Sequence, residues 1–315
     1  MRNRFRLSVV VSVVALALAL TAFVPAGAAA GAQPAAAPPA SVAAVVTPSV
    51  PHTLYISVAN RYLTMPHRIV AGRYYVQVRT SDPRSSVQVV RPPAGYTPRQ
   101  FLDARTHWWA VANSTTDDPR AAYTAFVRSV IFMGGAQVAR GGVGTFATGF
   151  SAGTYWLYED TYDGPTHLSR IVVLTVVGTP PVQTPFSTVG LVRFYPTTFA
   201  VTMPVRLPTA GWLMGLGGAP LNTLSIRKLL PGVTKADLDG FNVCFQEGPP
   251  DPLLNKDCFE RGAGVDFGGK VSAGASVFWY YRLAPGDYVA GNVAPTELFD
   301  HPFYSFGRYA RFTVS

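Results

Sequence analysis

Residues 151–158 have the sequence SAGTYWLY, and residues 168–177 have the sequence LSRIVVLTVV. Each is a short run of aromatic and β-branched residues, and the Asp163-Gly164 dipeptide between them is typical of a turn. Runs of this kind, bounded by glycine, serine and aspartate, favour β-strands. We therefore predict two consecutive strands here, and the rest of the chain is interpreted outward from this pair.

The same pattern returns later in the chain. Residues 283–290 are LAPGDYVA and residues 308–314 are RYARFTV, so a Gly-x-Tyr motif recurs after 133 residues and a Thr-Val motif after 138. Three further matches keep the same order and nearly the same spacing: Thr64-Met65-Pro66 with Thr202-Met203-Pro204, Gly95-Tyr96-Thr97 with Gly232-Val233-Thr234, and Leu102-Asp103 with Leu238-Asp239. A period this long indicates a duplicated domain and not a solenoid.

The repeat sets the expected domain boundaries. The first domain is predicted over residues 51–179 and the second over residues 186–315. Residues 180–185, PPVQTP, contain three prolines and are predicted to form a semi-rigid linker.

Both domains are predicted to be all-β. The expected strands cover residues 74–78, 87–90, 154–158 and 171–177 in the first domain, and 191–195, 224–226, 277–281 and 309–314 in the second. Helices are expected only at about 98–104 and 235–241, where Thr97 and Thr234 are suitable N-caps. Many short strands with Gly/Pro turns indicate β-sandwiches, so the predicted fold class is all-β, with two tandem sandwiches and short helices.

The N-terminal region predicts export. Residues 1–30 combine three arginines, an apolar stretch and the small residues Ala28-Ala29-Ala30, as a secretory signal peptide does. A membrane anchor is the alternative, because the apolar run is near the lower length for spanning a bilayer. Residues 31–50 are Ala/Pro-rich and predict a flexible linker. We expect a secreted, extracytoplasmic protein with no membrane span after signal cleavage.

Composition narrows the classes of function. Of the 315 residues, 48% are hydrophobic and 14% charged, which excludes a disordered chain. The formal net charge is +9, of which residues 51–179 carry +5 and residues 180–315 carry +1. The arginines are scattered without a run, so no nucleic-acid partner is expected. The basic excess favours an anionic surface, and the partners considered are a cell-wall polymer and another surface protein.

The strand pairs at 151–177 and 283–314 resemble the last two strands of a cupredoxin. The chain resembles secreted actinobacterial proteins with copper-free cupredoxin-like domains, whose final loop carries a Pro/His segment. Pro165 with His167, and His301 with Pro302, stand at that place. The resemblance implies two plastocyanin-like Greek-key sandwiches, in which the loop between the last two strands is the ancestral position of the copper ligands.

The sequence departs from the copper-binding members of that family. A blue-copper site needs a thiolate with two imidazoles, but residues 158–160 and 290–292 contain no cysteine. Multicopper oxidases need several His-x-His pairs, and the five histidines form none; they are His52, His67, His107, His167 and His301. We therefore expect no cofactor and no redox activity.

Two acidic loops are candidates for a divalent cation. The carboxylates and imidazoles concerned are Glu159, Asp160, Asp163 and His167 in the first loop, and Glu297, Asp300 and His301 in the second. Oxygen and imidazole ligands of this kind suit several divalent ions. The alternative interpretation is a pair of solvated turns.

Cys244 and Cys258 are the only cysteines. An even number in a secreted chain favours a disulfide, and closing a loop of this size stabilises by about 3 kcal/mol in the chain-entropy model. A redox or metal-binding pair is the alternative, but it lacks Cys-x-x-Cys spacing and a neighbouring histidine.

Two aromatic segments are candidates for ligand stacking or for core packing. His107-Trp108-Trp109 is expected on an exposed loop after the first short helix, where paired tryptophans stack on sugar rings or else pack over the end of a sandwich. In Phe278-Trp279-Tyr280-Tyr281, Phe278 and Tyr280 are expected on one face of a strand and Trp279 and Tyr281 on the other.

No nucleophile elbow, phosphate-binding glycine loop or His-Glu-x-x-His motif is present in the sequence, so no enzyme is predicted. We expect a secreted, non-catalytic binding or structural protein built from two copper-free cupredoxin-like domains. The alternatives are a metal-binding or metal-trafficking protein that uses the loops 159–167 and 297–301, and an enzyme whose site the sequence does not show.

Overall fold

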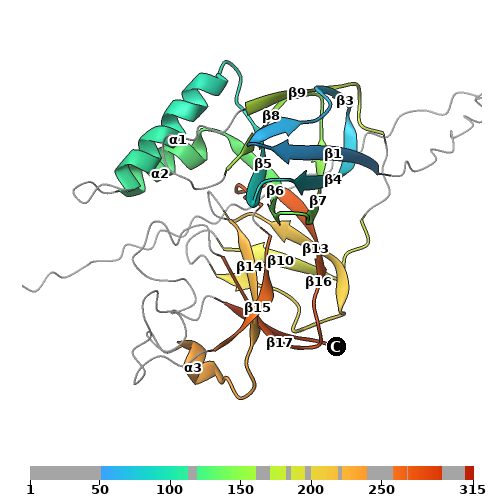
Figure 1. Ribbon diagram of the computed structural model, residues 1–315, viewed down its shortest axis with the longest axis vertical. Helices are drawn as coiled ribbons and strands as arrows, with labels where there is room; N and C mark the ends of the chain where they lie inside the picture. The colour runs from blue at the N-terminus through green and yellow to red at the C-terminus, as the bar shows by residue number, and fades with distance from the viewer. Residues whose placement is uncertain are drawn as a thin grey trace, which may run out of the picture. The chain divides into compact units, whose positions relative to one another are not determined.

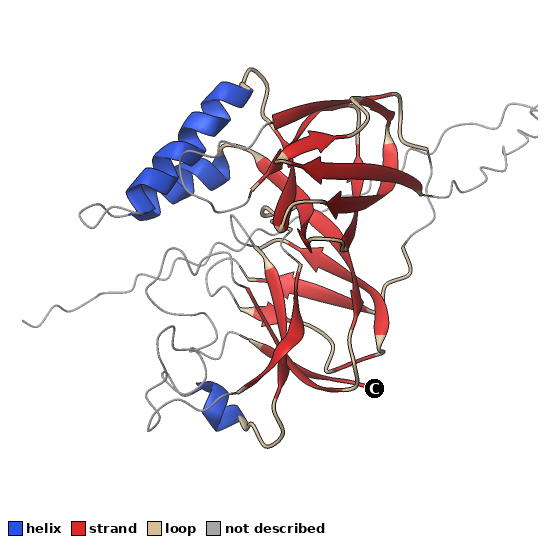
Figure 2. Cartoon of the chain, in the orientation of Figure 1, coloured by secondary structure: helices blue, strands red, loops and turns tan. Residues whose placement is uncertain are grey.

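The computed structural model describes residues 51–112, 119–160, 171–181, 186–195, 200–218, 222–239, 258–267, 269–292 and 309–315. These residues form an all-β structure with three helices, as Figures 1 and 2 show. The predicted signal peptide, N-terminal linker and most of the predicted 180–185 linker lie outside the described residues. The domain boundaries therefore stay a prediction.

The first half of the described chain is a two-layered sandwich. One layer has the strand order β2-β1-β4-β7 and the other the order β3-β9-β8-β5-β6. The strands are β1 (His52–Ala59), β2 (Tyr62–Thr64), β3 (Arg68–Val70), β4 (Gly72–Thr80), β5 (Arg84–Arg91), β6 (Ile131–Ala139), β7 (Val143–Phe150), β8 (Gly153–Glu159) and β9 (Ile171–Val177). Burial alternates along β1 and β4, as expected for strands with one face on a core.

The second half has the same strand order. Its layers are β11-β10-β13-β16 and β12-β18-β17-β14-β15. The strands are β10 (Gly190–Phe194), β11 (Val201–Thr202), β12 (Arg206–Leu207), β13 (Ala210–Leu216), β14 (Leu224–Leu229), β15 (Phe259–Asp266), β16 (Ser276–Arg282), β17 (Gly286–Asn292) and β18 (Ala310–Val314). The predicted fold class, two cupredoxin-like Greek-key sandwiches with short helices, is confirmed by this order.

The strand register also repeats. In the first half, parallel pairing of β3 with β9 sets Arg68 beside Thr175. In the second half, β12 and β18 set Arg206 beside Thr313, so both partners are displaced by 138 residues. The Gly-x-Tyr motif is equivalent too: Tyr155 Oη donates to the carbonyl four residues earlier at 3.1 Å, and Tyr288 Oη does the same at 2.8 Å.

The two halves share one sheet. Antiparallel pairing of β7 with β16 sets Ala147 beside Phe278 and Phe146 beside Trp279, which joins four strands from each half into an eight-stranded sheet. A single cluster of buried side chains contains residues from both halves, Val76, Trp279 and Tyr288 among them. This shared core therefore disfavours independent folding of the two sandwiches.

A short segment of the second half, residues 269–272, lies against β6 of the first. The Phe132 N–H donates to Ser272 Oγ at 2.9 Å, and the Gly134 N–H donates to the Lys270 carbonyl at 2.9 Å. A Cβ at Gly269 would lie 2.6 Å from the backbone nitrogen and oxygen of Gly135. This close approach of two main chains requires glycine at position 269.

Two of the three described helices pack on the first half, beside each other in Figure 1. Helix α1 (Pro98–Ala112) begins with a capping box, in which the Gln100 N–H donates to Thr97 Oγ1 and the Thr97 N–H donates to Gln100 Oε1. Helix α3 (Lys235–Asp239) has the equivalent pair, Thr234 and Asp237. Both predicted N-caps are confirmed.

The expected end of the first helix is wrong. We expected it to end near residue 104, but α1 continues to Ala112, because no glycine or proline interrupts it after Pro98. Helix α2 (Pro119–Arg128) has no counterpart in the expected elements. The second short helix was expected to reach about residue 241, and residues beyond Asp239 lie outside the described part.

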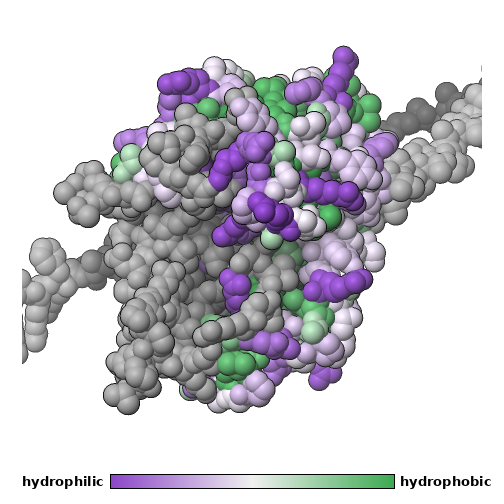
Figure 3. Space-filling model, in the orientation of Figure 1, coloured by the Kyte–Doolittle hydropathy of each residue, from purple (hydrophilic) through white to green (hydrophobic). Residues whose placement is uncertain are grey.

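The exposed surface is mixed in character. Figure 3 shows hydrophilic and hydrophobic residues interspersed over the described part of one face. None of the helices in the described ranges has the length and apolar character needed to cross a membrane.

Buried tyrosines make the fold sensitive to alkali. Burial raises the pKa of Tyr281 from its ordinary 10.0 to about 12, and its hydroxyl donates to the Pro208 carbonyl at 3.0 Å. Above pH 10 the unfolded chain loses this proton while the folded chain keeps it, so the free energy of unfolding should fall between about pH 10 and 12. Equilibrium unfolding over this range, with Tyr281→Phe and the exposed Tyr280→Phe as a control, should show a shallower decline in Tyr281→Phe alone. Parallel declines in all three proteins would contradict the assignment.

Candidate functional site

The end of strand β8 is the position at which the family resemblance places a copper thiolate. In this chain it is occupied by Glu159, the last residue of β8, and by Asp160. Pairing of β8 with β5 fixes the place of both, because Val87 lies beside Glu159 and the Asp160 N–H donates to the Ser86 carbonyl at 2.6 Å. Their side chains are only 1% and 2% exposed. The solvated-turn interpretation is therefore wrong for these two residues.

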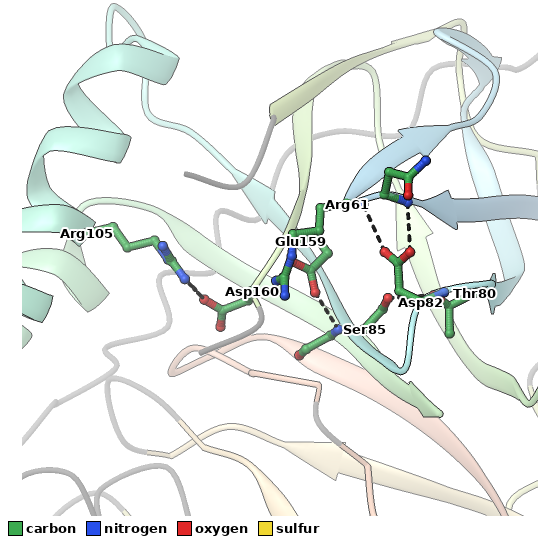
Figure 4. Close-up of polar contacts among 9 residues, drawn as sticks. Arg61, Thr80, Asp82, Ser85, Arg105, Glu159 and Asp160 are labelled. Atoms are coloured by element: carbon green, nitrogen blue, oxygen red, sulfur yellow. Dashed lines mark hydrogen bonds and ion pairs between the residues drawn. The ribbon is translucent and has the colours of Figure 1, made fainter. Parts of the chain in front are cut away.

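Asp160 holds two cations. Its Oδ1 accepts from Arg105 Nε and lies 3.1 Å from both Nε and Nη2 of that guanidinium, which reaches down from α1 (Figure 4). Its Oδ2 accepts from Lys270 Nζ. Arg105 is 7% and Lys270 is 9% exposed, so all three charges are nearly removed from water. This buried ion-pair group joins α1, the end of β8 and the 269–272 segment of the second half.

Glu159 caps the neighbouring strand. Its Oε1 accepts the Ser86 N–H at 3.0 Å, and its Oε2 lies 3.6 Å from Arg61 Nη1. Arg61 has a positive φ of 65°, and its N–H donates to the carboxylate of Asp82 at 2.8 Å. Figure 4 shows the carboxylates of Glu159, at the end of β8, and of Asp82 close to Arg61.

The second half has an uncharged equivalent at the end of β17. Asn292 is fully buried, and its Oδ1 accepts the Thr223 N–H at 3.0 Å. Strand pairing sets Leu224 beside Asn292, as Val87 lies beside Glu159 in the first half. The Asn292 amide also donates to Asn222 Oδ1 at 3.1 Å, and Asn222 in turn donates to the Val271 carbonyl. In both halves a strand-end side chain thus holds the adjacent strand by a backbone hydrogen bond.

The described residues at these two positions do not fit copper. A blue-copper centre needs a soft thiolate and neutral imidazoles. Here Asp160, directly after β8, is a carboxylate that already holds an ammonium and a guanidinium, and β17 ends in the amide of Asn292. Within the described ranges, no group of three His, Cys, Asp or Glu side chains is placed to hold a metal ion.

Several candidates from the sequence cannot be placed. Asp163, His167, Glu297, Asp300 and His301 lie outside the described residues. Cys244 also lies outside them, while Cys258 is 1% exposed and is not a free cysteine. The Cys244–Cys258 disulfide and the loop metal sites therefore stay predictions.

The His107-Trp108-Trp109 segment is not on an exposed loop. It lies in the last turns of α1, and Trp108 is 2% exposed, stacked on Phe126 of α2 with ring centroids 5.8 Å apart. Trp109 is half-buried and His107 is exposed. Aromatic packing between two helices accounts for Trp108, so it does not offer a ring to a ligand. The predicted faces of β16 are confirmed, with Trp279 and Tyr281 in the core.

Sequence reasoning did not find the partners of the acidic residues. Arg105, Lys270, Asn222 and Asn292 were not singled out, because they are separated from their partners by between 55 and 110 residues. The only signal in the sequence was the pair of equivalent strand ends, 159 and 292, at the 133-residue spacing of the Gly-x-Tyr motif.

No protein-family model and no curated protein sequence matches the chain. Solved structures similar to it include auracyanin from the photosynthetic bacterium Roseiflexus castenholzii, with 21% identity over 42% of this chain and 99% of that chain, at a TM-score of 0.25. A multicopper oxidase, mgLAC, has 9% identity, and a blue copper oxidase from Nitrosomonas europaea has 12%; each comparison covers 84% of this chain and 85% of the other, at TM-scores of 0.22 and 0.20. Similarity at this level says nothing about function, and the fold assignment rests on the strand order and register.

Proposed function

We propose that this protein is a secreted, non-catalytic binding or structural protein, in which two copper-free cupredoxin-like sandwiches serve as a rigid scaffold. The observation that supports the proposal is the buried ion-pair group of Asp160, Arg105 and Lys270 at the end of β8. A position that would supply a metal ligand in a cupredoxin instead ties the two halves together.

The electrostatics of this group favour a structural role. A carboxylate that is 2% exposed needs compensating charge, and here a guanidinium and an ammonium provide it. A metal cation at Asp160 would have to displace both of these cationic groups or bind against their electrostatic repulsion. In the second half, Asn292 carries no charge with which to attract a cation.

Metal binding by the acidic and histidine loops is the competing proposal, and one experiment separates the two. The purified protein is equilibrated with Cu(II), dialysed, and measured for bound copper and for its visible spectrum. We expect substoichiometric copper and no strong charge-transfer band, because no thiolate is available at the ends of β8 and β17.

The matched control is the double variant His167→Ala/His301→Ala, treated in the same way. Equal, low copper in both proteins supports the scaffold proposal. Stoichiometric copper that disappears in the double variant would establish the metal-binding alternative. A strong visible band in the unaltered protein would establish electron transfer.

A further inference from the structure

The outer face of the eight-stranded sheet carries positive charge and exposed aromatic rings. In the described strands of this sheet there are four arginines, Arg73, Arg79, Arg193 and Arg282, and no aspartate or glutamate. The other two sheets contain acidic residues, such as Glu159, Glu260 and Asp287. Of the three sheets, this is therefore the one whose described strands contain basic residues and no acidic residue.

Strand register gathers these groups into two neighbouring rows. Tyr55 lies beside Gln77, and Trp212 lies beside Tyr280, on the face turned away from the core. Gln77 pairs with Thr145 on β7, and β7 meets β16 at Ala147 and Phe278, two residues along from Thr145 and Tyr280, so both aromatic groups lie near the join between the halves.

The row beside it carries the arginines. Arg79 pairs with Val143, and Arg282 pairs with Ala210 on β13. We define the outer-face patch as Tyr55, Arg79, Trp212, Tyr280 and Arg282.

The aromatic rings of the patch are accessible, and ring contacts hold Tyr280 and Trp212 in place. Tyr55 is 61% and Tyr280 is 39% exposed. Trp212 is half-buried, with its ring centroid 5.4 Å from that of Tyr280 and 5.6 Å from that of Phe186, which lies over the join between the halves. Rings fixed by packing lose little entropy when a ligand stacks on them.

The charges of the patch are available to a ligand. Arg79 and Arg282 are exposed, and neither forms an ion pair within the described residues. Arg79 lies on β4 and Arg282 on β16, and one strand, β7, lies between these two in the sheet order. A face with positive charge and no acidic residue is complementary to an anionic polymer.

We infer that the outer-face patch binds an acidic polysaccharide, an inference that rests on the proposed function because it names the class of partner. The apolar faces of sugar rings would stack on Tyr55, Tyr280 and Trp212, and carboxylates along the chain would pair with Arg79 and Arg282. A guanidinium holds a carboxylate by two parallel hydrogen bonds. A single-stranded nucleic acid also presents anions and stacking rings along a chain, and the oligothymidylate arm of the test separates it from a polysaccharide.

The test measures the binding of the purified protein to polygalacturonate, with dextran as a neutral polysaccharide and an oligothymidylate as a nucleic acid. We expect polygalacturonate to bind, dextran to bind much more weakly, and the affinity to fall as salt is raised. Tyr280→Ala and Arg282→Gln should each weaken binding about tenfold, as expected for the loss of one stacked ring or one charged hydrogen bond.

The matched controls are Tyr195→Ala and Arg206→Gln, which alter exposed residues outside the patch. Unchanged binding in these controls, with thermal unfolding of all variants close to that of the unaltered protein, supports the inference. Equal losses in patch and control variants would overturn it, because they would show that binding depends on the net charge of the protein and not on the patch. Absence of polygalacturonate binding, or tighter binding of the oligothymidylate, would also overturn it. None of these outcomes depends on copper, so the proposed function is tested separately.

Discussion

Replacing Asp160 by alanine should lower the free energy of unfolding by about 3–5 kcal/mol, because it removes the carboxylate that two buried cations contact. Arg105 and Lys270 would be left at 7% and 9% exposure without that charge. Denaturant unfolding with a common slope for all variants measures the loss. Asp160→Asn, which keeps a hydrogen-bonding group but not the charge, should fall between the unaltered protein and Asp160→Ala.

The matched control makes the same chemical change at the surface. Asp103 pairs with Arg99 one turn earlier in α1, and both side chains are mostly exposed. Asp103→Ala should therefore change stability little, since exposed pairs of this kind are worth a fraction of a kcal/mol. If Asp160→Ala were as mild as Asp103→Ala, the ion-pair group would not hold the halves together, and the proposed structural role of this position would fail.

Replacing Gly215 by alanine should destabilise the second half by about 3 kcal/mol through overpacking. A Cβ at Gly215 would lie 2.2 Å from the ring of Trp279, and that ring is fully buried against Phe194 and Phe267. Because the indole is enclosed on several sides, it cannot move aside without disturbing the core. The expected result is a lower midpoint of denaturant unfolding.

Gly149→Ala is the control for this prediction. Gly149 also lies in a strand of the eight-stranded sheet, but a Cβ there would have no heavy atom within 4 Å. We expect Gly149→Ala to be neutral or slightly stabilising, as removal of a strand glycine often is. A loss in Gly149→Ala as large as that in Gly215→Ala would show that the loss reflects glycine in strands generally and not contact with Trp279.

The fold was largely predictable from short-range patterns. Alternating and β-branched runs located β4, β5, β8 and β9 in the first half and β10, β14, β16 and β18 in the second, and the repeated Gly-x-Tyr motif located β17. Strand β13, the equivalent of β4, was not predicted. The threonine N-caps were found because a capping box is a local feature. The length of α1 was missed, since Trp108 and Trp109 have modest helix propensity and are held by packing on α2.

The site was predictable only in part. The sequence identified Glu159 and Asp160 as unusual acids at a strand end, but it gave no means of pairing Asp160 with Arg105 and Lys270. Those contacts depend on how α1 and the second half pack against β8, which is a tertiary property. The pairing of β7 with β16 has the same origin, because nothing within either strand specifies a partner in the other half.

That shared sheet also bears on how the chain avoids aggregation. In each half taken alone, β7 or β16 would be an outermost strand with a row of unpaired backbone groups, which is a template for self-association. Their mutual pairing leaves β2 and β11, of three and two residues, at the two ends of the sheet. Edges this short offer little to a neighbouring molecule. Duplication thus converts two exposed edge strands, β7 and β16, into an internal strand pair. We expect either half produced alone to form dimers or precipitate.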